Sequence, residues 1–254
     1  MPRPFQSSGP AKWVPDALPP EDLAGRLRLV REAAEGLAVL TTSFGVEDQA
    51  LTHAIALAGL DFDIVTLDTG RLFPETYAVW AETERRYGRR IRAVYPDASS
   101  LESLVERQGI DGFYTSTEAR KACCGVRKVE PLRRALRGAS IWVTGLRAEQ
   151  SVERGDVAFV AFDDSLALWK TNPLFDWTRP KLDAFIAEHA VPVNVLHARG
   201  FPSIGCAPCT RAVASGEPER AGRWWWEDDR RKECGLHLGS DGRLVRSAHN
   251  EAVT

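Results

Sequence analysis

The sequence contains no hydrophobic run long enough to cross a membrane. Its longest unbroken apolar stretch is the six residues from Val157 to Phe162, whereas a membrane-spanning helix needs about 20. The first twenty residues also lack the apolar core of a secretory signal peptide, and they hold six of the fifteen prolines. We therefore expect a cytoplasmic protein with no membrane partner, whose residues 1–20 form a proline-rich arm.

An excess of charge of either sign is absent as well. The chain has 33 Lys and Arg against 35 Asp and Glu, a net charge of -2, so no overall field attracts nucleic acid. We expect no nucleic-acid partner, and an anionic ligand must be held by a local cluster of basic residues. The 254 residues, 44% hydrophobic and 27% charged, have an ordinary globular composition and suffice for one large domain with at most a small appendage.

Short apolar segments alternate with amphipathic ones along the first half of the chain. The segments with strand patterns are 37–40, 62–67, 91–95 and 141–144, and those with helical patterns are 21–35, 47–58, 74–87, 100–108 and 126–137. This alternation predicts an α/β fold, a mostly parallel sheet with flanking helices, over residues 21–193. Residues 194–254 are rich in turn-forming residues, and we interpret them as a C-terminal segment appended to that domain.

Polar turns follow three of the predicted strands, at residues 41–48, 68–71 and 144–147. Ligands of parallel sheets bind beyond the carboxyl ends of the strands, so these turns are candidates for a ligand site. The turn SFGVED precedes a helix and could offer N–H groups to a phosphate or sulfate, although no GK[ST] follows it as in a Walker A loop. For SFGVED, as for LDTGR, an ordinary structural turn is the alternative.

Cysteines are few, and their arrangement is the most informative feature of the sequence. Two tight pairs and one single residue make an odd total of five: Cys123, Cys124, Cys206, Cys209 and Cys234. Four thiolates suit zinc or an iron-sulfur cluster, and adjacent cysteines fit a 4Fe-4S cluster, which has separate irons, better than one zinc ion. The alternative is four ordinary buried thiols.

Basic residues accompany the cysteines. Lys128, four residues after Cys124, is a candidate partner for an anionic cluster or substrate. Cys234 lies in RKECGLH, whose positive charges lower a thiol pKa and favour a nucleophile; an incidental surface cysteine is the alternative. The preceding run Trp224 to Trp226 is equally compatible with a core plug and with a docking surface.

Taken together, these motifs resemble the assimilatory sulfonucleotide reductases, in particular the cluster-containing branch that reduces adenosine 5'-phosphosulfate (APS). The resemblance covers about three quarters of the chain, from Ser43 to His237, through the segments SFGVEDQ, LDTGRLFPETY, KACCGVRKVEPL, VTGLRAEQS, NPLFDW, GCAPCTRAV, GEPERAGRWWWE and KECGLH. The combination of CC, CxxC and ECGLH is highly specific. Relatives without a cluster use the 3'-phosphorylated nucleotide (PAPS) and lack both cysteine pairs, so the pairs favour APS.

The resemblance implies a fold similar to the adenine nucleotide alpha-hydrolases and assigns roles to particular residues. It implies a 4Fe-4S cluster on Cys123, Cys124, Cys206 and Cys209, with Cys234 as the catalytic nucleophile. The substrate-binding residues that it implies are Ser43, Phe44, Gly45, Asp48, Asp68, Thr69, Gly70, Arg71, Lys128, Gly145, Arg147, Arg154, Arg220, Arg223 and His237.

The implied reaction is thioredoxin-dependent reduction of APS to sulfite and AMP, for sulfate assimilation and cysteine biosynthesis. Cys234 would carry the sulfur as an S-sulfocysteine, and a thiol of thioredoxin or glutaredoxin would release sulfite, because no cysteine remains beyond the four cluster ligands and Cys234. A homo-oligomer is compatible with this interpretation. The alternatives are a PAPS reductase or related nucleotide-dependent sulfur transferase, and a non-catalytic four-cysteine metal protein that binds a nucleotide or a partner.

Overall fold

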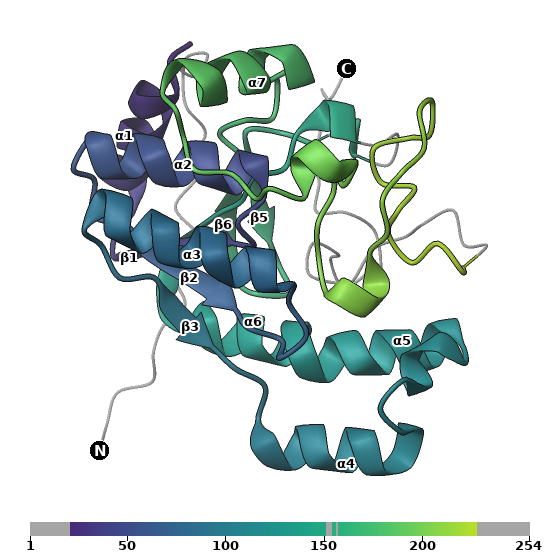
Figure 1. Ribbon diagram of the computed structural model, residues 1–254. Helices are drawn as coiled ribbons and strands as arrows, with labels where there is room; N and C mark the ends of the chain where they lie inside the picture. Colours follow the sequence, from purple (N-terminus) through teal and green to yellow (C-terminus); the bar gives the residue numbers. More distant parts are fainter. Residues whose placement is uncertain (1–20, 151–153, 156, 228–254) are drawn as a thin grey trace, which may run out of the picture.

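The computed structural model describes residues 21–150, 154–155 and 157–227, in which a six-stranded sheet lies between two layers of helices (Figure 1). The strands are β1 (Leu37–Thr42), β2 (Asp63–Leu67), β3 (Arg92–Val94), β4 (Ala139–Val143), β5 (Val160–Asp163) and β6 (Leu168–Thr171). Their order is β3-β2-β1-β4-β6-β5, and every neighbouring pair is parallel except β5 with β6. The predicted α/β fold with a mostly parallel sheet is therefore confirmed.

Seven α-helices occur in the described part of the chain. They are α1 (Leu23–Ala33), α2 (Val46–Leu57), α3 (Pro74–Tyr87), α4 (Ala98–Gln108), α5 (Thr117–Cys124), α6 (Glu130–Ala135) and α7 (Arg179–Glu188). Local sequence explains several ends: the Asp22 carboxylate accepts from Gly25 N at 2.6 Å before α1, and α3 ends at Gly88 in the left-handed conformation. None of these helices is long and apolar enough to cross a membrane.

Four elements were not expected from the sequence, namely β5, β6, α5 and α7. The helix predicted over 126–137 instead begins as a π-helical turn, η2 (Gly125–Val129), that continues α5 before α6 starts. Ser116 caps α5 by accepting from Ala119 N at 3.1 Å. The many charged residues that follow Ser116 masked this capping pattern in the sequence. The continuous α5–η2–α6 rod carries the first cysteine pair at its centre.

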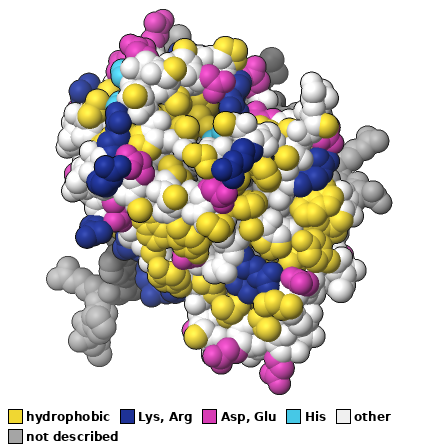
Figure 2. All heavy atoms as spheres, in the orientation of Figure 1, with side chains coloured by type: hydrophobic (Ala, Val, Ile, Leu, Met, Phe, Trp, Pro, Cys, Tyr) yellow, Lys and Arg dark blue, Asp and Glu magenta, His cyan; other side chains and the backbone are white. Residues whose placement is uncertain are grey.

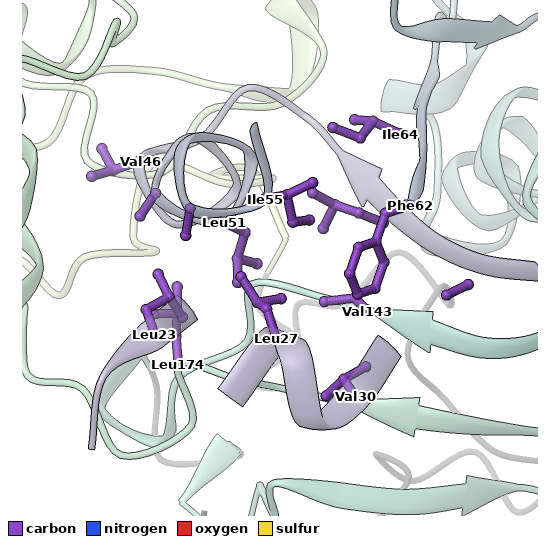
Figure 3. Close-up of a cluster of buried hydrophobic side chains, with 14 of the residues drawn as sticks. Leu23, Leu27, Val30, Val46, Leu51, Ile55, Phe62, Ile64, Val143 and Leu174 are labelled. Carbon is purple, nitrogen blue, oxygen red and sulfur yellow. The ribbon is translucent and has the colours of Figure 1, made fainter. Parts of the chain in front are cut away.

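Both faces of the sheet are buried, as a parallel sheet requires. On one face α1, α2, α3 and α7 cover the larger core, where Leu27, Leu51 and Val143 lie together (Figure 3). On the other face α6 covers a smaller core through Leu132 and Leu136, and α4 and α5 lie on the same side (Figure 1). Neither layer covers the carboxyl ends of the central strands.

The strand order opens a crevice at those carboxyl ends. The chain runs outward from β1 through β2 to β3, and it then returns to place β4 on the opposite side of β1. Such a reversal is the usual ligand site of an open α/β sheet. Gly145, just after β4, permits the close approach of the two turns, because a Cβ atom there would lie 2.7 Å from Asp48 Oδ1.

Residues 194–227 return to this crevice in irregular structure with two short turns of helix, η5 (His197–Arg199) and η6 (Ala207–Cys209). The proline-rich arm at 1–20 and the chain from residue 228 onward, with Cys234 and His237, lie outside the described residues.

A buried histidine between α2, α3 and α7 gives a prediction for stability. His53 is 4% exposed, its ring is stacked on His189 at 5.0 Å, and its Nδ1 lies 3.0 Å from the Tyr87 hydroxyl. Burial, with the nearby charges of His189 and Arg86, lowers the pKa of His53 to about 4. Between about pH 6.5 and pH 4 the unfolded chain therefore binds a proton that the folded chain does not, so folding loses about 3 kcal/mol as pH falls through this window.

Urea unfolding of the wild type and of His53→Gln at pH 7 and pH 4 measures this effect. The glutamine retains a polar partner for Tyr87 but has no proton to bind, so the free energy of unfolding should fall by about 3 kcal/mol less in the variant than in the wild type. Equal losses in both proteins would contradict the assignment to His53.

Candidate functional site

A cavity of about 200 Å³ occupies the crevice at the carboxyl ends of β1, β2 and β4. Nine of the residues predicted for substrate binding line it, and they come from five separate segments of the chain. They are Ser43, Gly45, Asp48, Thr69, Lys128, Gly145, Arg154, Arg220 and Arg223. The fold thus brings most of the predicted substrate residues to one place.

The turn after β1 is held together by a carboxylate. Asp48 accepts from Ser43 N at 2.6 Å and from the Ser43 hydroxyl at 2.9 Å. Burial raises the pKa of Asp48 to about 6, against the lowering effect of these hydrogen bonds. Phe44, with a left-handed φ of 60°, points away into the core and stacks on Trp80 at 5.5 Å. The Ser43 N–H already donates to Asp48 and is therefore not available to an anionic ligand. The positive charge that holds an anion must come from another wall of the cavity.

The turn after β2 connects the cavity to the cysteines. Asp68 accepts from Gly70 N at 2.9 Å and from the Tyr77 hydroxyl at 2.8 Å, which fixes the turn, and Gly70 adopts a left-handed φ of 69°. Thr69 Oγ1 lies 3.2 Å from Cys206 Sγ. Arg71 points toward Asp111 and the ring of Phe113, on the cysteine side. Asp68 and Gly70 therefore shape the turn, while Thr69 lines the cavity itself.

Both cysteine-bearing segments are docked on this same turn. The Ala207 N–H of η6 donates to the Arg71 carbonyl at 2.8 Å, and Arg127 of η2 donates to the Thr69 carbonyl at 2.6 Å. As a result the four paired thiols, which come from segments more than 80 residues apart, line one small pocket: Cys123, Cys124, Cys206 and Cys209. The structure therefore brings the two cysteine pairs, which were expected to share one site, to the same pocket.

The thiol pocket shares a wall with the larger cavity. Lys128, Cys206 and Trp224 line both. Burial acts to raise the pKa of Cys206, but the charge of Lys128, the Thr69 contact and nearby arginines outweigh it and lower that pKa. In contrast, burial and the neighbouring Cys206 raise the pKa of Cys209 to about 12.

The donor set suits a thiolate-bound metal group. Four sulfurs surrounded by cationic side chains match the ligands of iron-sulfur clusters and of structural zinc. Within the described ranges, no three His, Cys, Asp or Glu side chains are grouped in the manner that one metal ion requires.

Arg147 has a different environment from the one that the resemblance implies. Its guanidinium is fully buried and lies 2.9 Å from Glu47, 3.3 Å from Glu149 and 3.4 Å from Glu219. It does not line the cavity, whereas its partners Glu47 and Glu219 do. From its buried position outside the cavity, Arg147 thus links Glu47 and Glu219, which belong to two different walls.

Sequence reasoning missed several residues of the cavity wall. Among them are Glu47, Trp142, Gln150, His197 and Glu219. Glu47 and Glu219 lie inside the motifs SFGVED and GEPER, so their position next to predicted site residues was the available signal. Gln150 follows the turn after β4 and donates to Glu47 at 2.9 Å, and it also accepts from Arg154.

The walls of the cavity differ in charge. Glu47, Asp48 and Glu219 supply carboxylates, and Lys128, Arg220 and Arg223 supply positive charges. Gly205 makes room for Arg223, because a Cβ atom there would overlap the guanidinium. An elongated ligand with one anionic end would therefore be oriented with that end toward Lys128, Arg223 and Cys206.

The three tryptophans of the run have different environments. Trp224 is 1% exposed and lies between the guanidinium groups of Arg120 and Arg223, at 4.6 and 4.8 Å from the ring centre. Trp225 is 40% exposed and packs edge-on against Trp226. In the orientation of Figure 1, apolar side chains gather at the right of the molecular surface (Figure 2). Trp224 is a core plug, and Trp225 faces outward.

Comparisons with known proteins agree with this geometry. The family model described as "Phosphoadenosine phosphosulfate reductase domain" matches residues 37–212. The adenosine 5'-phosphosulfate reductase of Sinorhizobium fredii (strain USDA 257) is 54% identical over 228 residues, which cover 90% of each chain. That of Rhizobium meliloti is 53% identical over 238 residues, 93% of this chain and 89% of the relative.

A solved structure shows the same fold. The phosphoadenylyl-sulfate (PAPS) reductase from Candida auris, in a phosphate complex, superposes with a TM-score of 0.64 and 26% identity over 75% of this chain and 90% of that one. The expected likeness to adenine nucleotide alpha-hydrolases is thereby confirmed at the level of the fold. On the match of residues 37–212 and the identity to relatives over nearly their whole length, the chain belongs to the phosphoadenosine phosphosulfate reductase domain family.

Proposed function

We propose that this protein reduces APS to sulfite and AMP in sulfate assimilation, with thiols as the source of electrons. The observation that carries the proposal is the wall shared by the two cavities, where Lys128, Cys206 and Trp224 separate the crevice at the strand ends from four thiols. APS is favoured over PAPS because the relatives at 53 and 54% identity are named APS reductases, whereas the PAPS reductase is 26% identical.

The proposal includes a 4Fe-4S cluster held by Cys123, Cys124, Cys206 and Cys209. The support is the single pocket that the four thiols line and the cationic side chains around it. When bound, such a cluster would supply a fixed electrostatic environment beside the substrate and hold the two cysteine segments together. The electrons of the reaction come from thiols, so no change in its oxidation state is needed.

The nucleophile of the proposal is Cys234. Its thiolate attacks the sulfur of the sulfate group, an S–S bond forms, and the bond from that sulfur to the bridging phosphate oxygen breaks, so that AMP leaves. Lys128, Arg220 and Arg223, together with His237, would neutralise the charge that develops on the transferring and leaving groups. The product on the enzyme is an S-sulfocysteine.

An outside dithiol completes the reaction, because the other four cysteines are assigned to the cluster. A thiolate of thioredoxin, or of a glutaredoxin, attacks the Cys234 sulfur, sulfite leaves with the electron pair of the broken S–S bond, and a mixed disulfide remains. The second thiol of the partner then resolves that disulfide and restores Cys234. A cytoplasmic location is part of the proposal, since its reductants keep these thiols reduced.

Mixing the enzyme with APS in the absence of any reductant tests the proposal. We expect one AMP per active site, one sulfonate adduct located on Cys234 by mass spectrometry, and sulfite release only after reduced thioredoxin is added. PAPS in place of APS serves as the control and should give much less of its own leaving nucleotide, adenosine 3',5'-bisphosphate.

Other outcomes identify the alternatives. Free sulfite in the first step would overturn the covalent mechanism, and faster turnover of PAPS would identify a PAPS reductase. Binding of nucleotide with no AMP formed from APS and no adenosine 3',5'-bisphosphate formed from PAPS would indicate the non-catalytic metal protein.

A further inference from the structure

A buried ion pair joins the cysteine helix to the last described residue of the chain. Arg120 of α5 donates to both carboxylate oxygens of Glu227, from Nε and from Nη2, at 2.8 Å each. The two side chains are 1% and 3% exposed. Among the ion pairs within the described ranges, no other has both side chains so deeply buried. Such two-point charge pairs are strong and strongly directional.

Each partner of this pair is tied to a different cysteine segment. Arg120 lies one helical turn before Cys124 in α5, and both residues line the four-cysteine pocket. On the other side, Glu227 N donates to the Trp224 carbonyl at 2.9 Å, and Trp224 N donates to the Cys209 carbonyl at 3.2 Å. The pair therefore closes a loop of contacts from Cys124 through residues 224–227 to Cys209.

We propose that Arg120 and Glu227 are positioning residues, which fix the point from which the chain leads to Cys234 and couple that point to the four-cysteine pocket. This inference rests on the proposed function, in which Cys234 must reach the substrate cavity. Cys234 follows Glu227 by seven residues, so an anchored Glu227 confines its sulfur to within about 25 Å, the span of an extended segment of that length.

The size of the effect depends on how much chain is released when the pair is broken. Freeing Glu227 alone moves the nearest anchor back only to Trp226, which packs on Tyr114 and Phe113, and the local concentration of Cys234 at the cavity would fall by less than about twofold. A buried arginine left without its carboxylate must gain water, however, and this exposes the Trp224 ring that packs on it. The nearest anchor is then Arg223, whose backbone is bridged to Thr210 and whose guanidinium donates to the Ile204 carbonyl. Arg223 lies 11 residues before Cys234, so the concentration falls about twofold.

The test compares Glu227→Gln with Glu217→Gln. Glu217 forms a two-point pair with Arg211 in the same segment, also at 2.8 Å for each bond, but its side chain is 32% exposed and it does not line the cavity. Both substitutions remove one charge and keep the side-chain shape. Three quantities are measured on the purified, metal-loaded protein: hydrogen exchange of the Trp224 and Glu227 amides, APS affinity, and the single-turnover rate of AMP formation at saturating APS.

For Glu227→Gln we expect amide exchange at both residues to rise at least about tenfold. The rate of AMP formation should fall about twofold, and APS affinity should stay unchanged. Glu217→Gln should leave all three unchanged. A Glu227→Gln protein that exchanges faster but forms AMP at the wild-type rate would overturn the proposal, since the pair would then be structural only.

Glu227→Asp covers the case in which the glutamine variant does not fold. It keeps the charge but shortens the side chain by one methylene, so intermediate changes in exchange and rate support the proposal, and wild-type values of both overturn it. If the wild-type protein forms no AMP from APS, the proposed function fails first, and the exchange comparison alone decides whether the pair anchors residue 227.

Discussion

Replacing Cys234 with serine is expected to abolish AMP release from APS, with a single-turnover rate at least about 10⁴-fold below that of the wild type. A serine hydroxyl is not ionised at neutral pH and is a far poorer nucleophile than a thiolate. Attack by its oxygen would also form a sulfate ester, which leaves the sulfur unreduced. The measurement is AMP formed in the first turnover without reductant, together with the mass of the intact chain.

The same variant should leave the remaining chemistry in place. Cys234→Ser is expected to retain the visible absorption, the iron content and the APS affinity of the wild type, because Cys234 is not one of the proposed metal ligands. AMP formation at the wild-type rate would show that the nucleophile is another group. Loss of iron in this variant would instead place Cys234 among the ligands.

Cys206→Ser is expected to remove or damage the metal group. Cys206 is 7% exposed, lines both cavities and lies against Thr69, so no other sulfur can replace it in that position. We expect the wild type to contain about four irons and four acid-labile sulfides per chain. The variant should contain less than half of these and show no measurable AMP formation.

Cys234→Ser is the matched control for this experiment, because it also exchanges one thiol for a hydroxyl but outside the pocket. Full iron content in Cys206→Ser would contradict the ligand assignment. A colourless wild-type protein with one zinc per chain would contradict the iron-sulfur assignment for all four cysteines and restore the zinc alternative.

Local sequence patterns predicted the central part of the fold. The expected strands at 37–40, 62–67, 91–95 and 141–144 correspond to β1 to β4, and the helix expected over 74–87 has those bounds in the structure. These elements are specified by neighbouring residues: an apolar run, a proline in the first turn of a helix, a glycine after the last. The strands β5 and β6 have four residues each, too few to establish a period.

Local patterns also identified the residue types of the site but not their directions. Ser43 and Phe44 are adjacent in one motif, yet Ser43 lines the cavity while the ring of Phe44 packs on Trp80. Arg147 was expected beside the substrate, and the structure surrounds it with Glu47, Glu149 and Glu219. A side chain's direction depends on backbone torsions and on partners from other segments, which a motif does not contain.

By itself, then, the sequence determined the chemistry that the chain carries: two cysteine pairs, one separate cysteine, basic residues near the first pair and near the separate cysteine, and an alternation of strands and helices. Only the tertiary structure decided which of these residues meet. Cys124 and Cys206 line one pocket because η2 and η6 dock on the same turn after β2, and Arg120 pairs with Glu227 across 107 residues of chain. Contacts over such separations arise from the packing of whole elements, which no local pattern encodes.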